Sequence, residues 1–269
     1  MSDFSTLQLQ RDPRGFVTLW LDRPDKHNAF NAAMIAELVA VFATLAAQPD
    51  IRFLMLRGRG RHFSAGADLD WMRASAALDY SANLADAHQL GEVMHRLYHL
   101  PFPTLAVVQG AAFGGAVGLT ACCDMAIGTT DAQFSLSEVR LGLIPGVISP
   151  YVVQAIGERA TRRYGLSAER FDGLRATELG LLAEVCPDEQ LEALVQRWIA
   201  TLLHNSPQAM RACKTLLQDV GSGVLSQALR ERCEDAIARI RVSEQGQEGL
   251  DAFLEKRPPG WVRAAQSPQ

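Results

Sequence analysis

The sequence predicts an α/β fold. Two segments carry this prediction, because in each an apolar run typical of a buried strand leads through small residues into a helical pattern. The first has its apolar run at residues 51–56 and its helical pattern at 68–72; the second has a β-rich run at 104–108, a break at Gly110 and a helix start at Gly114 and Gly115. With 269 residues, 48% of them hydrophobic, the chain can bury a substantial core without disulfides.

The other elements follow from local patterns in chain order. Residues 16–21 form a β-rich run that ends before Pro24, and Asn31 is a suitable N-cap for a helix over 32–47. A longer helical pattern covers 80–100, and the chain from 155 onward is predicted to be helical, with a short extended element at 181–187. Asn205-Ser206-Pro207 marks a boundary, since Ser-Pro is a natural helix start, and amphipathic helices are expected at 208–220, 224–242 and 244–255.

Composition excludes several classes of protein. The 26 basic and 30 acidic residues give a net charge of −4, so no strong attraction to nucleic acid or an anionic membrane is expected. The five cysteines have no C-x-x-C spacing, which favours reduced thiols over zinc or a disulfide framework. The first residues lack the apolar core of a presequence, and no apolar run reaches membrane-spanning length. We therefore expect a cytoplasmic protein.

The two strand-to-helix turns predict an oxyanion site. A helix start leaves backbone N–H groups without partners, and at Gly114 and Gly115 no side chain keeps a ligand oxygen away from them. Residues 57–69 form a second turn of this kind. Two such turns can converge on one carbonyl oxygen and stabilise an enolate. Close packing or turn chemistry is the alternative for either turn taken alone.

Two further patterns suggest cofactors and are rejected. The Gly-x-Gly at residues 58–60 lacks the third glycine of a dinucleotide fingerprint, because position 63 is Phe63. His88, His95 and His99 share one helical segment, but no acidic partner completes a zinc-binding arrangement. A half-exposed helix face is the favoured interpretation, and we predict no metal.

Several separated motifs, in the right order, resemble the crotonase, or enoyl-CoA hydratase and isomerase, superfamily. They are LDRPDKHNAF at 21–30, FSAGADL at 63–69, and the segments 110–124, 134–146 and 253–257. The resemblance covers nearly the whole chain. It implies a crotonase spiral of ββα units over residues 1–205, with the CoA and active site, and an α-helical trimerisation unit over 206–269. A homotrimer or a dimer of trimers is then expected.

The resemblance also implies a role for named residues. The N–H groups of Ala67 and Gly115 would be the two oxyanion donors. An acyl-CoA thioester would be the substrate, with no separate cofactor. The implied CoA contacts are Lys26, Ala29, Ala65, Asp68, Leu69 and Gly114, and Phe253 and Lys256 would close the site from a neighbouring subunit. A solvated loop lysine remains the alternative for Lys26, and a simple helix terminus for Lys256.

The motifs retain one of the two acids of a typical hydratase. In two-glutamate hydratases the turn reads Gly-Gly-Gly-x-Glu, and the position of that first glutamate is Gly118 here, whereas the second matches Glu138. The apolar neighbours of Glu138 should desolvate the carboxyl group and raise its pKa, which suits a group that alternates between base and acid. These neighbours are Phe134, Leu136, Val139 and Leu141. The missing side chain at Gly118 is expected to leave room for a branch at the β-carbon of the acyl chain.

Within the superfamily, residues 137–145 together with 148–151 resemble the bacterial 3-methylglutaconyl-CoA hydratase branch of leucine catabolism. Close relatives act on γ-carboxygeranoyl-CoA or isohexenylglutaconyl-CoA in acyclic terpene breakdown. Such substrates carry a distal carboxylate, which Arg140 or Arg73 would pair with, unless these are surface arginines.

Two other functions compete with hydration. A Δ3,Δ2-enoyl-CoA isomerase also works with one glutamate, at the position of Glu138. A nucleic-acid-binding or structural paralogue is the second competitor. One relative binds RNA through lysines on the helix equivalent to 32–47, but that segment has no Lys or Arg here. We therefore predict a hydratase and discount an RNA role.

Overall fold

The strands of the protein form two sheets. The structure is a computed structural model that describes residues 4–262. The larger sheet has the order β1-β2-β3-β4-β6-β9, with β1 antiparallel to β2 and the other neighbours parallel. Its strands are β1 (Leu7–Arg11), β2 (Val17–Leu21), β3 (Leu54–Gly58), β4 (Thr104–Val108), β6 (Met125–Thr129) and β9 (Glu184–Cys186). The smaller sheet contains β5 (Ala111–Phe113), β7 (Gln133–Ser135) and β8 (Phe171–Asp172) in the order β5-β7-β8.

The chain repeats one unit: a strand of the large sheet, an extended segment in the small layer, and a helix. Thus β4 leads through β5 into α4 (Gly115–Cys122), and β6 leads through β7 towards α5 (Ser149–Ser167). In the two earlier units a single residue replaces the second strand, since bridges join Phe30 to Ala67 and Ser64 to Ala112. The helices of these units are α1 (Ala32–Ala46), α2 (Leu69–Ala76) and α3 (Tyr80–Tyr98). This is the ββα spiral that the motifs imply.

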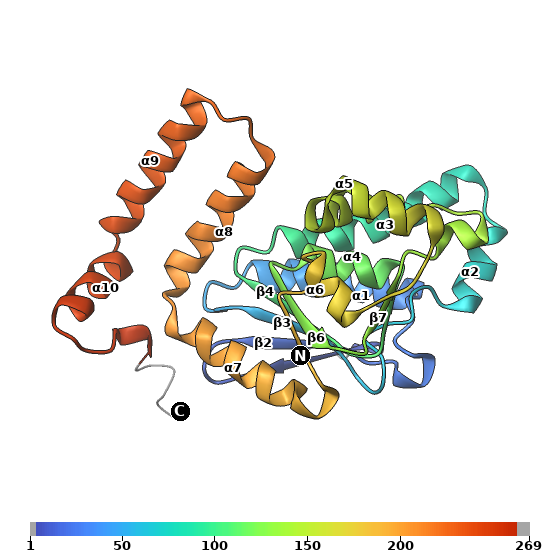
Figure 1. The fold of residues 1–269 in the computed structure, drawn as a ribbon, viewed down its shortest axis with the longest axis horizontal. Helices are drawn as coiled ribbons and strands as arrows, with labels where there is room; N and C mark the ends of the chain where they lie inside the picture. The colour runs from blue at the N-terminus through green and yellow to red at the C-terminus, as the bar shows by residue number, and fades with distance from the viewer. Residues whose placement is uncertain (1–3, 263–269) are drawn as a thin grey trace.

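Helices cover both faces of the large sheet (Figure 1). Along β4, Ala106 and Val108 pack in the core under α1, α3, α4 and α5, whereas Leu105 and Val107 pack against α7 (Leu191–His204). A parallel strand buried on both sides in this way is apolar along its whole length, as the run at 104–108 predicted. The remaining elements are short: α6 (Gly173–Glu178) and the 3-10 helices η1 (Pro24–Lys26), η2 (Glu138–Leu141) and η3 (Asp188–Gln190).

Most local predictions hold. Asn31 caps α1, with its side chain accepting a hydrogen bond of 2.9 Å from the N–H of Met34. One boundary is wrong: α5 begins at Ser149 rather than at 155, because Pro150 sits in the first turn, where a missing N–H costs no helical hydrogen bond. That helix also breaks at Gly157, whose φ of 77° is not helical.

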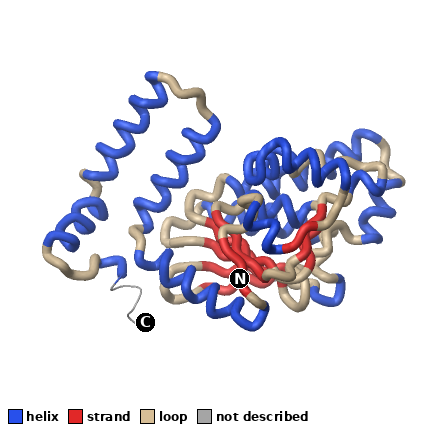
Figure 2. Tube along the Cα trace, in the orientation of Figure 1, coloured by secondary structure: helices blue, strands red, loops and turns tan. Residues whose placement is uncertain are grey.

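The C-terminal helices α8 (Pro207–Ser222), α9 (Gln227–Arg241) and α10 (Glu244–Leu254) extend away from the sheets. We call them the arm; Figure 2 shows that it consists of helices joined by loops. Its residues after 262 lie outside the described residues. The arm begins where the sequence predicts, with Ser206 accepting a hydrogen bond of 3.1 Å from the N–H of Ala209.

Buried cations attach the arm to the core. The Arg52 guanidinium of the core holds the segments on either side of the arm, because it donates to the carbonyl oxygens of Leu203, in α7, and of Trp261, which follows α10, at 2.7 and 3.0 Å. In the other direction, Lys214 of α8 pairs with the Asp124 carboxylate at 2.8 Å. Such donors fix the direction of the arm, because each would lose its partner on detachment. No helix within residues 4–262 is long and apolar enough to span a membrane.

Candidate active site

The two predicted turns lie side by side. Ser64 donates its N–H to the Ala111 carbonyl at 3.0 Å, and Phe113 donates to the Ser64 carbonyl at 3.1 Å. Gly66 has a φ of +92°, and a Cβ at this position would lie 3.0 Å from the Phe113 carbonyl oxygen. Glycine is therefore required here both for the backbone conformation and for the close approach.

The first turn presents the N–H of Ala67. In the bridge to Phe30, the neighbours of Ala67 make the contacts: Phe30 donates to the Gly66 carbonyl at 2.7 Å, and Asp68 donates to the Phe30 carbonyl at 2.8 Å. The N–H of Ala67 itself points to the other side, as every second amide of a strand does. Within the described chain it has no hydrogen-bond acceptor.

The second turn presents the N–H of Gly115. Gly115 is the first residue of α4, so its N–H has no intrahelical acceptor, and none of the described residues supplies another. A Cβ at Gly115 would lie 3.2 Å from the Phe30 ring. Since the backbone of Phe30 is bridged to Ala67, Phe30 contacts both turns, in addition to the direct hydrogen bonds between them.

Glu138 lies against the start of α4. It opens η2, directly after β7, whose last residue Ser135 accepts a hydrogen bond of 2.9 Å from the N–H of Gly114. A Cβ at Gly114 would lie 3.2 Å from Oε1 of Glu138. The absence of a side chain at Gly114 therefore lets the carboxyl group approach the turn that carries the N–H of Gly115.

The carboxyl group of Glu138 is desolvated. Its Oε2 is buried and has no hydrogen-bond partner among residues 4–262. Burial raises the pKa of Glu138, against the opposing effect of a backbone hydrogen bond. Phe134 and Leu136 are buried beside it as expected, but Leu141 is 59% exposed and adds no such shielding. A carboxyl group with a raised pKa and an unused oxygen can accept and return a proton.

The expected space at Gly118 does not exist. A Cβ on Gly118 would lie 2.3 Å from Cγ2 and 2.8 Å from Cβ of Ile148, and 3.2 Å from Cε of Met94. The prediction that this position accepts a branch of the acyl chain is therefore wrong. Ile148 belongs to the motif at 148–151, but its contact with Gly118 was not predicted, because only the packing of α5 against α4 brings the two residues together.

The loop before α1 supports the site through a residue that sequence reasoning missed. Asn28 is fully buried in a left-handed conformation, and its Nδ2 donates to the carbonyls of Arg59 and His62 at 2.8 Å each. Its Oδ1 accepts from the N–H of Arg23 at 2.9 Å. Asparagine tolerates the left-handed region better than most residues, so an Asn inside the loop motif was the available signal.

The implied CoA contacts on this loop differ in accessibility. Lys26 is exposed, and its ammonium group has no hydrogen bond or ion pair with any residue between 4 and 262. Ala29 is buried, with its carbonyl accepting from Arg23 at 2.6 Å. Ala65 donates its N–H to the His27 carbonyl at 2.9 Å, which connects this loop to the turn that carries Ala67.

Asp68 and Leu69 begin α2. Asp68 caps the helix by accepting from the N–H of Asp70 at 2.9 Å, and its other oxygen pairs with Arg23 at 3.0 Å. Burial acts to raise the pKa of Asp68, but these hydrogen bonds hold it below its ordinary value. The carboxylate is thus engaged by the fold, whereas the side chain of Leu69 is 69% exposed and open to a ligand.

Phe253 and Lys256, the last two of the implied CoA contacts, lie far from both glycine-containing turns of the same chain. Phe253 belongs to α10 and Lys256 follows it, and Figure 1 places α10 at the opposite end of the molecule from α2. Phe253 is 81% exposed.

Two arginines were considered as partners for a distal carboxylate of the substrate. Arg73 pairs with Asp70 on the surface at 2.9 Å. Arg140 is exposed, and its guanidinium has no partner among the described residues.

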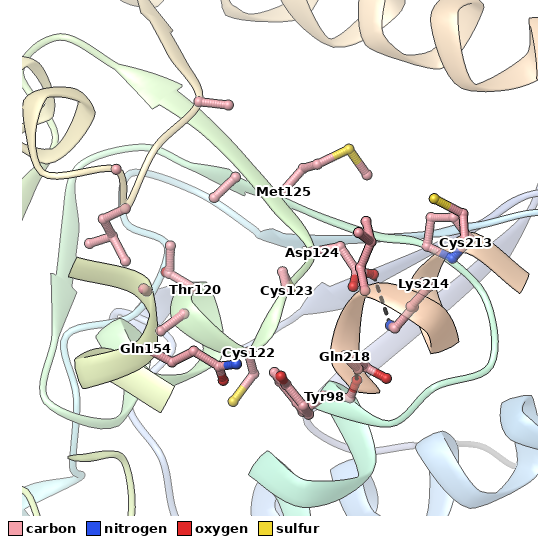
Figure 3. Close-up of a pocket in the computed structure, with 18 of the residues that line it drawn as sticks. Tyr98, Thr120, Cys122, Cys123, Asp124, Met125, Gln154, Cys213, Lys214 and Gln218 are labelled. Atoms are coloured by element: carbon pink, nitrogen blue, oxygen red, sulfur yellow. Dashed lines mark hydrogen bonds and ion pairs between the residues drawn. The ribbon is translucent and has the colours of Figure 1, made fainter. Parts of the chain in front are cut away.

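A cavity of about 580 Å³ lies elsewhere, between the C-terminal end of α4 and α8 (Figure 3). Thr120, Cys122 and the Asp124–Lys214 pair line it. The cavity thus lies at the opposite end of α4 from Gly115.

No group of three or more His, Cys, Asp or Glu side chains suited to a metal ion occurs in the described part of the chain.

The α/β fold thus contains two turns whose N–H groups, at Ala67 and Gly115, have no acceptor among the described residues, and a desolvated carboxyl group that lies against the second turn. These are the groups that an enzyme needs to stabilise an oxyanion and to move a proton. The enoyl-CoA hydratase/isomerase family matches residues 12–264, and the chain belongs to this family.

Solved structures of relatives have the same fold. An enoyl-CoA hydratase from Shewanella pealeana is 49% identical, with a TM-score of 0.91 over 96% of this chain and 97% of that one. Pseudomonas aeruginosa AtuE is 36% identical, with a TM-score of 0.92 over 96% of this chain and all of the other (100%). Among relatives known by sequence, the 2,3-dehydroadipyl-CoA hydratase of Escherichia coli is 29% identical over 256 residues, 95% of this chain and 98% of that protein.

Proposed function

We propose that the protein adds water to a branched 2-enoyl-CoA, with 3-methylglutaconyl-CoA of leucine catabolism or a related isohexenylglutaconyl- or γ-carboxygeranoyl-CoA of terpene catabolism as substrate. The observation that carries the proposal is the position of Glu138, whose Oε1 lies against Gly114 while Oε2 is buried without a partner in residues 4–262. An acid with an unused oxygen next to Gly115, one of the two proposed oxyanion donors, supports the proposed proton transfer.

In the proposed reaction the thioester oxygen accepts hydrogen bonds from the N–H groups of Ala67 and Gly115. Glu138 removes a proton from water as the water oxygen bonds to the β-carbon and the double bond opens. The negative charge moves to the thioester oxygen, where the two donors stabilise it. Glu138 then returns its proton to the α-carbon, so that one carboxyl group serves as base and acid.

The choice of acyl chain rests on the motif resemblance of residues 137–145 and 148–151. One relative supports a substrate with a distal carboxyl group, because it is named for 2,3-dehydroadipyl-CoA, the thioester of a dicarboxylic acid. Arg140 is the candidate partner for that group, since Arg73 already pairs with Asp70. A branch at the β-carbon must be accommodated away from Gly118, where Ile148 fills the space.

A Δ3,Δ2-enoyl-CoA isomerase is the second candidate. The observation in its favour is the packing of Gly118 against Ile148, which leaves Glu138 as the acid at the start of α4. An isomerase would use Glu138 to move a proton between C2 and C4 without adding water.

Labelled water separates the two reactions. The protein is incubated in H₂¹⁸O with 3-methylglutaconyl-, isohexenylglutaconyl- or crotonyl-CoA, and the products are analysed by mass spectrometry. We expect ¹⁸O in a 3-hydroxyacyl product, with kcat/KM at least tenfold higher for the branched, carboxylated substrates, about 1.4 kcal/mol of transition-state preference. Unlabelled products with a shifted double bond would establish the isomerase, and equal rates for crotonyl-CoA would refute the choice of acyl chain.

We also propose that residues 206–269, which include the arm, form an oligomerisation unit that joins three copies of the chain or two such trimers. Its supporting feature is apolar exposure: Phe253, Leu254 and Leu225 are 81%, 75% and 92% exposed. Leu225 lies between α8 and α9, and Phe253 and Leu254 lie in α10, so exposed apolar side chains occur at both ends of the arm, where a partner could cover them. In this arrangement Phe253 and Lys256 reach the CoA site of the neighbouring copy.

Mixing two inactive variants tests this arrangement. Phe253→Ala/Lys256→Ala chains retain Glu138, whereas Glu138→Gln chains retain Phe253 and Lys256. If the site is shared between copies, coexpression of the two variants creates some sites with every wild-type group, and activity should exceed that of either variant alone. No gain in mixed oligomers of verified composition would place all contacts in one chain. A monomer in sedimentation analysis of the wild type would exclude the oligomer.

A further inference from the structure

Two glycines in the first turn of α4 each approach a side chain from another element. Gly114 is the N-cap of α4, and its carbonyl accepts a hydrogen bond of 3.4 Å from the N–H of Gly118. Glu138 Oε1 lies 3.2 Å from the Cβ position of Gly114, and Ile148 Cγ2 lies 2.3 Å from that of Gly118. Glu138 and Ile148 therefore both contact the N-terminal part of α4.

Ile148 is held firmly in this place. Its side chain is 3% exposed, and its carbonyl accepts hydrogen bonds of 3.1 Å from the N–H groups of Tyr151 and Val152 at the start of α5. Met94 of α3, which is fully buried, closes the other side with its Cε 3.2 Å from the Cβ position of Gly118. A side chain at 118 could not be admitted by a small movement of either neighbour, because the core around them is closely packed.

We infer that Ile148 is the residue that restricts this enzyme to one acid, because it occupies the volume that a carboxylate-bearing side chain at position 118 would need. The inference rests on the proposed function. Positions 118 and 148 then form a matched pair. Glycine at 118 requires a branched apolar side chain at 148 to fill the core, whereas an acid at 118 requires a small residue at 148.

The packing half of the inference is tested by a thermal-unfolding cycle. Gly118→Ala should lower the Tm of the wild type, although alanine is the better helix former. The same change in an Ile148→Gly background should be neutral or raise the Tm. Ile148→Val is the matched control, because valine keeps the branch that meets position 118 and should keep the penalty. Should Ile148→Gly fail to fold, Ile148→Ala gives a weaker form of the same test: it removes Cγ2 but keeps Cβ, 2.8 Å from the Cβ position of residue 118, so it should relieve the penalty only in part. A Gly118→Ala variant as stable as the wild type would overturn the inference.

The chemical half is tested by restoring the second acid. Gly118→Glu/Ile148→Gly is compared with Gly118→Gln/Ile148→Gly, which has the same size and no carboxyl group. We expect at least a tenfold higher kcat for hydration of crotonyl-CoA with the glutamate, within the range of general acid–base catalysis. Equal rates in two folded variants would show that position 118 does not face the reacting atoms. Failure of the wild type to bind or hydrate any enoyl-CoA would refute the proposed function, while the unfolding cycle would still test the packing.

Discussion

Glu138→Gln should reduce the rate of hydration by about 10²- to 10⁴-fold, because an amide can neither take the proton from water nor return it to the α-carbon. Glutamine has nearly the same volume, so the loss should fall on kcat, with CoA-thioester binding retained. The measurement is steady-state kinetics together with calorimetric titration of a CoA product.

The pH dependence of the wild type provides a further readout of Glu138. The base must be deprotonated, and its pKa is raised by burial, so kcat/KM should fall on the acid side with a midpoint above the 4.5 of an ordinary glutamate. The same burial costs stability once the carboxyl group ionises, that is, as pH rises through its raised pKa. Glu138→Gln should therefore raise the Tm at pH 8 more than at pH 4.

The control is Glu158→Gln. Glu158 is an exposed glutamate whose ion pair with Arg162, at 3.3 Å, lies on the surface of α5. Removing such a pair changes stability little and should leave kinetics and their pH profile unchanged. A Glu138→Gln enzyme within tenfold of the wild type would assign the proton transfer to another group.

Gly115→Pro should lower kcat by about 10²- to 10³-fold, the loss found when one oxyanion donor is removed. Proline has no N–H, and Gly115 is the first residue of α4, a position where helices accept proline. Gly114 before it has no Cβ to clash with the proline ring. The substitution thus deletes a donor and preserves the helix start.

Gly115→Ala distinguishes the effect of losing the N–H group from the effect of adding side-chain atoms at position 115. Its Cβ would lie 3.2 Å from the Phe30 ring, so a modest loss of activity and stability is expected although the N–H remains. The difference in kcat between the alanine and proline variants, each checked for a native Tm, measures the donor. If both variants have similar rates, the N–H of Gly115 is not part of an oxyanion site.

Local features of the sequence were sufficient to predict much of the fold. The β-rich run 104–108 coincides with β4, and the cap at Asn31 and the start of the arm at Ser206 are as expected, because each depends on neighbouring residues only. The start of α5 was misplaced, since Pro150 was not recognised as a first-turn residue. Asn28 was missed because its partners, Arg59 and His62, are more than thirty positions away in sequence.

What the sequence by itself determined is which chemical groups are present: two glycine-containing turns with unpaired N–H groups, one glutamate at 138 and none at 118. Only the tertiary structure decided how these groups are used. The bridge from Phe30 to Ala67 and the contact of Glu138 with Gly114 join elements distant in the chain. The side chain of Ile148 fills the space beside Gly118 that was expected to be open. The reason is physical: a residue's type is fixed locally, whereas the volume around it is fixed by every element that packs there.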